Sequence, residues 1–173
     1  MTVHALLVTG APGVGKSVVA NEIGELLRLA DAPSAVIDLD ALGRVHPPAG
    51  GTYNSDLIIA NLAATWPHYA ALGVRYVVLA RVIGNHSEHA AIEDALGGAA
   101  VTVCRLVAPQ SVISDRLTRR ETGLALPFLQ RISPIVGAEI DLLAVEDFSV
   151  ENGAGRTVTA VAGEIVAHME WPG

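Results

Sequence analysis

Cysteine is nearly absent from this sequence, because Cys104 is the only one among 173 residues. A single cysteine can form neither a disulfide within the chain nor a thiolate metal site, and this usage is typical of the reducing cytoplasm, where we expect the protein to reside. Basic residues are outnumbered, with 11 Lys and Arg against 18 Asp and Glu, which gives a formal net charge of −7. This balance argues against nucleic acid or a membrane surface as a partner and favours small-molecule ligands.

Long hydrophobic runs are lacking as well. The first apolar run, residues 5–8, stops at Thr9 and Gly10, so the sequence gives no indication of a secretory signal. The longest stretch without Asp, Glu, Lys or Arg spans residues 57–74, but polar residues and Pro67 make it a poor membrane span. We expect this stretch to form a buried helix that leads into a strand.

What the sequence does contain is a repeated alternation of short β-rich apolar runs and helical stretches, in a chain that is 51% apolar. This pattern predicts a three-layer α/β/α fold in which helices cover both faces of a five-stranded parallel sheet. The length suits one domain that spans residues 1–173. The predicted strands are residues 3–9, 35–37, 75–80, 101–107 and 148–150.

The predicted helices alternate with these strands. The first helix begins at Gly15 and ends by Pro33, and the connections 45–54 and 121–126 are expected to be irregular. Both connections leave the carboxyl side of strands, where open α/β sheets bind ligands. The first helix is expected to bury Val18, Val19, Ile23, Leu26 and Leu27, and the other predicted helices are residues 55–72, 88–96, 111–120, 127–144 and 157–169.

A glycine-rich segment lies between the first predicted strand and the first predicted helix. It has a glycine, four residues, a second glycine, a lysine and a serine, which is the phosphate-binding P-loop or Walker A motif. Such a loop curls so that its N–H groups point at phosphate oxygens, and the helix N-terminus adds a favourable dipole. The nucleotide-binding segment consists of Gly10, Ala11, Pro12, Gly13, Val14, Gly15, Lys16 and Ser17, with Val18 directly after it.

Lys16 and Ser17 carry the chemistry of this motif. Lys16 is the only lysine in the chain, and its compact ammonium is expected to bridge the β- and γ-phosphates of a nucleotide. The Ser17 hydroxyl is expected to bind a magnesium ion, which prefers hard oxygen ligands. The alternative is a glycine-rich turn that matches by chance, but a position between a strand and a helix favours ATP or GTP binding.

Two carboxylates, Asp38 and Asp40, follow the second predicted strand at alternate positions. We therefore expect both on one side of the carboxyl edge of the sheet, facing the phosphates. One could orient magnesium through water, and the other could accept the proton of a substrate hydroxyl that attacks the γ-phosphate. The alternative is that either aspartate simply caps the helix that follows.

Residues 10–17, the pair Asp38 and Asp40 with Arg44 beyond it, and the arginine-bearing helix 111–120 together resemble the small P-loop kinases of metabolites. This group includes shikimate, gluconate and adenylylsulfate kinases, chloramphenicol phosphotransferase and the nucleoside monophosphate kinases. The resemblance implies a five-stranded parallel sheet, with ATP as the phosphoryl donor and Mg²⁺ as its cofactor. It also implies that Asp40 meets the substrate hydroxyl as the catalytic base, while Asp38 serves the magnesium side.

Arg116 and Arg120 lie one helical turn apart near the end of the predicted helix 111–120. The resemblance implies a short helical lid over about residues 116–131, in which arginines stack on the adenine and close over the phosphates. Arg116 is then the candidate for base stacking and Arg120 the candidate for catalysis. The alternative is a solvated helix whose arginines pair with neighbouring acidic residues.

Three further arginines are candidate ligand contacts. Arg44 and Arg81 follow the second and third predicted strands, where either could bind an anionic substrate or serve a structural role at the surface. Arg156 opens the last helix and could border the adenine or form a turn. Tyr53 and Trp66 could line the acceptor pocket, although aromatic residues at such spacing are more often in the core.

The sequence thus predicts an ATP-dependent phosphotransferase, a kinase that transfers the γ-phosphate to a hydroxyl or phosphate of a small metabolite. One alternative is a nucleotide-binding regulatory protein that hydrolyses ATP or GTP slowly. Another is a degraded kinase that binds nucleotide without turnover. The latter stays open because Arg81 follows the third predicted strand, where the resembling kinases often carry an acidic residue.

Overall fold

In the computed structural model, which describes residues 2–50 and 52–173, five strands form one sheet. The strands are β1 (His4–Thr9), β2 (Ser34–Asp38), β3 (Tyr76–Ala80), β4 (Val101–Val107) and β5 (Phe148–Glu151). All neighbouring pairs are parallel, and the order across the sheet is β2-β3-β1-β4-β5. The predicted five-stranded parallel sheet is confirmed.

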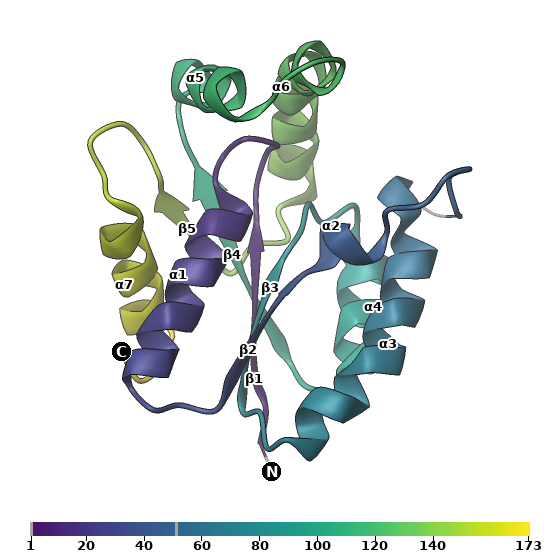
Figure 1. Cartoon of the computed structure of the whole chain (residues 1–173), viewed down its shortest axis with the longest axis vertical. Helices are drawn as coiled ribbons and strands as arrows, with labels where there is room; N and C mark the ends of the chain where they lie inside the picture. The colour runs from purple at the N-terminus through teal and green to yellow at the C-terminus, as the bar shows by residue number, and fades with distance from the viewer. Residues whose placement is uncertain (1, 51) are drawn as a thin grey trace.

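Helices cover both faces of this sheet. They are α1 (Lys16–Leu29), α2 (Leu39–Leu42), the short 3₁₀ helix η1 (Thr52–Asn54), α3 (Ser55–Ala71), α4 (His86–Ala95), α5 (Gln110–Arg120), α6 (Ala125–Leu143) and α7 (Val158–His168). α1 and α7 lie side by side on one face, and α3 and α4 lie on the other (Figure 1). The beginning of α6 lies with α5 beyond the carboxyl end of the sheet, at the top of the view (Figure 1). The predicted three-layer α/β/α class is therefore confirmed.

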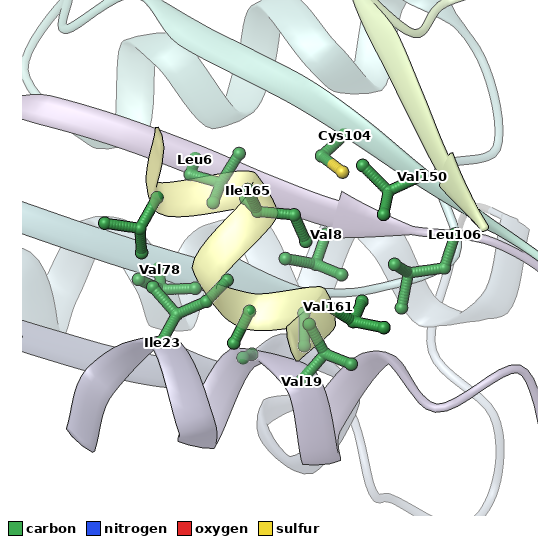
Figure 2. Packing of buried hydrophobic residues seen from close by; sticks show 14 of the residues in the cluster. Leu6, Val8, Val19, Ile23, Val78, Cys104, Leu106, Val150, Val161 and Ile165 are labelled. Atoms are coloured by element: carbon green, nitrogen blue, oxygen red, sulfur yellow. The ribbon is translucent and has the colours of Figure 1, made fainter. Parts of the chain in front are cut away.

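Side chains of β1 alternate between two buried layers, as they must in a strand covered on both faces. Leu6 and Val8 belong to the layer under α1 and α7, whereas Ala5 and Leu7 belong to the layer under α3 and α4. Burying a side chain of this size contributes about 1.5–3 kcal/mol, so each layer ties its helices firmly to the sheet. Figure 2 shows the first layer, with Leu6, Val8, Val78, Leu106 and Val150 from strands and Val19, Ile23, Val161 and Ile165 from helices.

The uncharged stretch that follows η1 forms the buried helix α3 that the sequence predicts. Ile58, Leu62 and Trp66 are buried against the sheet, so Trp66 is a core residue, which was the alternative to a place in the pocket wall. No helix within residues 2–50 and 52–173 is both long and apolar enough to cross a membrane.

Two local expectations are wrong. Val18 is 55% exposed, because the first turn of α1 lies beside the glycine-rich loop, where Val18 lines three cavities and does not pack on the sheet. The expectation that Asp38 and Asp40 project to one side as alternate residues of extended chain is also wrong, because β2 ends at Asp38 and the short helix α2 begins at Leu39. The remaining residues predicted for the buried face of α1 are buried or partly buried.

Strand register brings three segments to one point at the carboxyl edge of the sheet. Asp38 at the end of β2 and Val8 near the end of β1 both stand opposite Ala80, the last residue of β3. The loop after β1, the carboxylates after β2 and Arg81 after β3 therefore converge. This is the crevice in which open α/β sheets bind ligands.

Candidate active site

The loop between β1 and α1 has a backbone that only glycine tolerates. Gly13 and Gly15 have φ of 88° and 109°, which side chains rarely adopt. A Cβ on Gly15 would lie 2.7 Å from the amide nitrogen of Asn152, and one on Gly13 would lie 2.7 Å from Leu117. The loop is therefore a cradle that fits a phosphate group, with the N-terminus of α1 at its end.

Lys16 is buried inside this cradle. Its ammonium donates hydrogen bonds to the carbonyl oxygens of Gly10 at 3.0 Å and Ala11 at 3.4 Å. Burial lowers the pKa of Lys16 to about 8, with Arg120 acting in the same direction and Asp40 and Asp38 opposing it. A phosphate anion beside this amine would favour its charged form.

Ser17 and Asp38 lie together at the start of α1 and the end of β2. The Ser17 hydroxyl donates a hydrogen bond of 2.7 Å to Oδ2 of Asp38, and Oδ1 of Asp38 accepts one of 3.1 Å from the backbone N–H of Asp40. Asp38 thus caps α2, which was the alternative weighed from the sequence, and it also contacts Ser17.

The oxygens of Ser17 and Asp38 fit a magnesium ion that also binds phosphate oxygens, because magnesium prefers hard oxygen ligands. In the part of the chain that the structure describes, no group of three or more His, Cys, Asp or Glu residues could hold a metal by itself. A magnesium ion at Ser17 would therefore depend on the phosphates of a nucleotide for further ligands.

The Asp40 carboxylate lies beside both Lys16 and Arg81. Desolvation raises the pKa of Asp40, while the charges of Lys16 and Arg81 lower it and that of Asp38 raises it. The side chain is still 52% exposed, so a ligand can reach it. A half-exposed carboxylate with a raised pKa is suited to accept a proton.

Arg81 does not lie where the sequence suggested. We expected it at the mouth of the acceptor pocket or on the surface, but it is fully buried. Its backbone N–H donates to the carbonyl of Val8 in β1, so the backbone of Arg81 continues the pairing of β3 with β1 beyond Ala80. Its guanidinium donates to the Glu88 carboxylate at 2.6 Å and lies 3.4 Å from the Asp40 carboxylate, so it pairs with Asp40 from the buried side of the site.

A cavity of about 310 Å³ lies beside the loop and brings together six of the predicted site residues, Gly13 and Gly15 among them. The apolar side of this nucleotide-side cavity comes from valines of α1 and α7, and the polar side comes from arginines and Asn152. A flat aromatic base between aliphatic side chains and guanidinium groups fits such a lining. The predicted residues that line it, beyond the loop glycines, are Val18, Arg116, Arg120 and Arg156.

Arg116 and Arg156 already have protein partners. Arg116 donates to the carbonyl of Val14 at 3.0 Å and to the side-chain oxygen of Asn152 at 3.4 Å. Arg156 donates to the carbonyl of Glu151 at 2.8 Å and to the carboxylate of Glu164 at 2.6 Å. Both guanidinium groups are thus held at the edge of the nucleotide-side cavity.

A second cavity, of about 590 Å³, contains the polar centre of the site. This acceptor cavity is lined by Lys16, Ser17, Asp38, Asp40, Arg44 and Arg120, together with Tyr53, Val82 and apolar residues of α6. Arg44 and Tyr53 are both exposed and both line this cavity, so Arg44 lies at the surface and in the cavity wall, and its role toward a substrate stays a prediction. Arg120 lines both cavities while its guanidinium donates to Glu121 at 2.6 Å, so the acidic pairing that was the alternative is present and the lid role stays a prediction.

Two buried residues that hold the loop were missed from the sequence. Asn152 donates to the carbonyl of Val14 at 2.8 Å, and Ser133 of α6 donates to the carbonyl of Pro12 at 2.8 Å. Asn152 had a signal, because it directly follows β5 at the carboxyl edge of the sheet. Ser133 had none, because a serine inside a long amphipathic helix is unremarkable in sequence.

Comparisons with known proteins agree with this fold. No protein-family model matches the chain. No curated protein matches it either. Among solved structures, the tunicamycin resistance protein of Deinococcus radiodurans is 20% identical with a TM-score of 0.63. The match covers 98% of this chain and 96% of that one.

Two kinases show the same likeness. A gluconokinase from Sinorhizobium meliloti is 16% identical with a TM-score of 0.64, and the match covers 96% of this chain and 91% of that one. The adenylylsulfate (APS) kinase of Mycobacterium tuberculosis, solved with AMPPNP and APS, is 18% identical with a TM-score of 0.58 over 98% of this chain and 99% of that one. At these identities the likeness establishes the fold, which is that of small kinases over nearly the whole chain.

Proposed function

We propose that this chain is an ATP-dependent phosphotransferase that transfers the γ-phosphate to a hydroxyl or phosphate of a small metabolite. The observation that carries the proposal is the placement of Lys16, Ser17 and Asp40 around one cavity. Phosphate-binding groups and a half-exposed carboxylate meet there, which is the arrangement that phosphoryl transfer to an oxygen nucleophile requires.

On the donor side, the loop N–H groups and Lys16 would hold the β- and γ-phosphates, while Arg116 and Arg156 would border the base. Ser17 would bind magnesium directly, and Asp38, which accepts the Ser17 hydrogen bond, would orient it. A magnesium ion bound there supplies positive charge that stabilises the phosphate oxygens during transfer.

On the acceptor side, Asp40 would accept the proton of the attacking hydroxyl. The new bond joins the acceptor oxygen to the γ-phosphorus, and the bond from that phosphorus to the β–γ bridging oxygen breaks, which leaves ADP. The raised pKa of the Asp40 carboxyl makes Asp40 a stronger base than an ordinary aspartate. Arg120, which lines both cavities, would neutralise charge in the transition state, and Arg44 would bind acceptor groups at the rim.

A nucleotide-binding protein with slow or no turnover is the second candidate, because β3 ends at Ala80 and Arg81 follows it in place of an acid. Asp38, at the end of β2, would then be the one carboxylate at a strand end, among the described residues, that could orient the magnesium ion. The two candidates differ in one property, since only the kinase needs an acceptor for rapid ATP consumption.

The deciding experiment measures ATP consumption by the purified protein with magnesium, alone and with a panel of sugars, nucleosides, amino alcohols and hydroxylated natural products. Stimulation by one class, together with a phosphorylated product in mass spectrometry, supports the kinase. Lys16→Ala is the control, and it should lower transfer by about 10²-fold or more. Tight nucleotide binding without stimulation by any compound would favour the regulatory alternative.

A further inference from the structure

A third cavity, of about 390 Å³, adjoins the acceptor cavity. The two share Tyr53, Val82 and Val136 in their walls, so these three side chains form the boundary that a ligand spanning both cavities would contact. We call this third space the distal cavity. It lies between the segment that follows β3 and the second half of α6.

The lining of the distal cavity is apolar. Ile83, Ile140, Leu142 and Leu143 line it besides the shared valines, and of the described residues in its wall only Glu139 is charged. A phosphate or carboxylate in this space would find no cationic side chain in the described lining, and it would lie near the Glu139 carboxylate. The acceptor cavity differs, because Lys16, Arg44 and Arg120 line it.

Tyr53 stands where the two cavities meet. Partial burial and the neighbouring Glu139 carboxylate raise the pKa of the Tyr53 phenol, so it stays protonated at neutral pH. Because the phenol already shares a hydrogen bond with the Glu139 carboxylate, the valines contribute the apolar contacts at this boundary, as in pockets that bind largely apolar molecules.

We infer that the acceptor is an amphipathic alcohol, with a hydroxyl at Asp40 and an apolar body without anionic groups in the distal cavity. The inference rests on the proposed function for the hydroxyl end, and on the lining of the distal cavity for the apolar end. With volumes of about 590 and 390 Å³, the two spaces suit a molecule of drug-like or natural-product size. Small hydroxy acids and sugar phosphates fill only the acceptor cavity.

A binding series tests the apolar end without requiring turnover. The probes are alkyl β-D-glucosides from methyl to hexyl, below their micellar concentrations, titrated into protein saturated with magnesium and AMPPNP and followed by ligand-observed NMR. Affinity should rise by up to about threefold to fourfold for each methylene that enters the distal cavity. Gluconate and glucose 6-phosphate, which carry anions, should bind more weakly than the hexyl glucoside. A flat series, or tighter binding of the two anionic probes, overturns the inference.

Matched variants locate the binding. Val82→Asp places a carboxylate at the junction of the two cavities and should abolish the dependence on chain length. Ile135→Asp is the control, because Ile135 is 55% exposed on α6 and lines neither cavity. Leu143→Ser, at the other end of the distal cavity, should weaken only the longest probes. If Ile135→Asp removes the length dependence while Val82→Asp keeps it, the alkyl chains bind the outer surface of α6 and the inference fails.

Nucleotide binding by each variant confirms that it is folded, because the nucleotide-side cavity shares neither Val82 nor Leu143. Turnover gives a separate result. If no alcohol is phosphorylated, the proposed function fails even where the alkyl series binds with a slope. If gluconate or another anionic metabolite is the only substrate, the function stands and the amphipathic acceptor is wrong.

Discussion

The buried guanidinium of Arg81 lies 3.4 Å from the half-exposed carboxylate of Asp40. The guanidinium also donates to Glu88, at the N-terminal end of α4, and the second carboxylate oxygen of Glu88 accepts a hydrogen bond of 2.6 Å from the backbone N–H of Gly84. Glu88 therefore competes with Asp40 for the charge of Arg81. The pKa of Asp40 therefore depends on how much of the Arg81 charge is neutralised by Glu88.

Glu88→Gln should shift the acidic limb of the pH profile for phosphoryl transfer to lower pH. The neutral amide releases the charge of Arg81 toward Asp40, and a nearby positive charge lowers the pKa of a carboxylate. The profile of kcat/KM against pH measures the shift. Glu93→Gln is the control, because Glu93 lies on the same helix and accepts a hydrogen bond from the backbone of Val101, far from Arg81 in the chain. An unshifted profile for Glu88→Gln would mean that Arg81 does not influence Asp40.

Nucleotide affinity should fall as the pH rises above about 8, the pKa of Lys16 in the ligand-free protein. Phosphate favours the ammonium form, so at higher pH the amine must take up a proton when nucleotide binds, and the affinity loss approaches tenfold for each pH unit. Calorimetry at pH 9 in buffers with different ionisation enthalpies measures that uptake. In Lys16→Arg the arginine side chain stays charged at pH 9, so this variant should take up no proton at position 16 when nucleotide binds. Equal proton uptake by the wild type and this variant would contradict the prediction.

Lys16→Met should stabilise the nucleotide-free protein by about 1–3 kcal/mol at pH 7, although it removes function. The folded-state pKa of Lys16 is lowered from 10.5 to about 8, so the unfolded chain binds the proton more strongly. Stability therefore rises as the pH increases from about 8 to 10.5, and below that window the charged amine opposes folding by its full amount. Urea denaturation without nucleotide measures the difference. A variant less stable than the wild type would mean that the hydrogen bonds to Gly10 and Ala11 outweigh desolvation.

The fold and the loop could be predicted from sequence because their signals are local. β-rich runs define the strands, and the glycine spacing of residues 10–17 between a strand and a helix is typical of a phosphate-binding loop. Arg81 was misplaced because its position depends on Glu88, seven residues later, which reads as an ordinary helix residue. Asn152 and Ser133 reach the loop across 138 and 121 residues of chain, so the contacts themselves leave no local pattern, and only the place of Asn152 after β5 marks it as a residue of the carboxyl edge. The distal cavity was likewise invisible, because tertiary packing of α6 creates it.

Asn152→Ala should cost about 1–3 kcal/mol of stability and weaken nucleotide binding. The substitution removes the amide N–H that donates to the Val14 carbonyl and the amide oxygen that accepts a hydrogen bond from Arg116. Thermal unfolding with and without nucleotide separates the two effects. Asn21→Ala on the exposed side of α1 is the control and should change neither. Full nucleotide affinity in Asn152→Ala would show that the loop keeps its shape without this side chain.

Asp40→Asn and Asp38→Asn should separate the acceptor side of the site from the magnesium side. Asp40→Asn removes the proposed base, so transfer should fall by about 10²–10⁴-fold while nucleotide affinity stays nearly unchanged. Asp38→Asn weakens the contact with Ser17, so it should raise the magnesium concentration needed for half-maximal activity. The asparagine at position 38 can still cap α2, which keeps the backbone at position 40 in place. If Asp40→Asn instead raises the magnesium requirement and lowers nucleotide affinity as much as it lowers transfer, then Asp40 serves the metal, and the acceptor hydroxyl must lose its proton elsewhere.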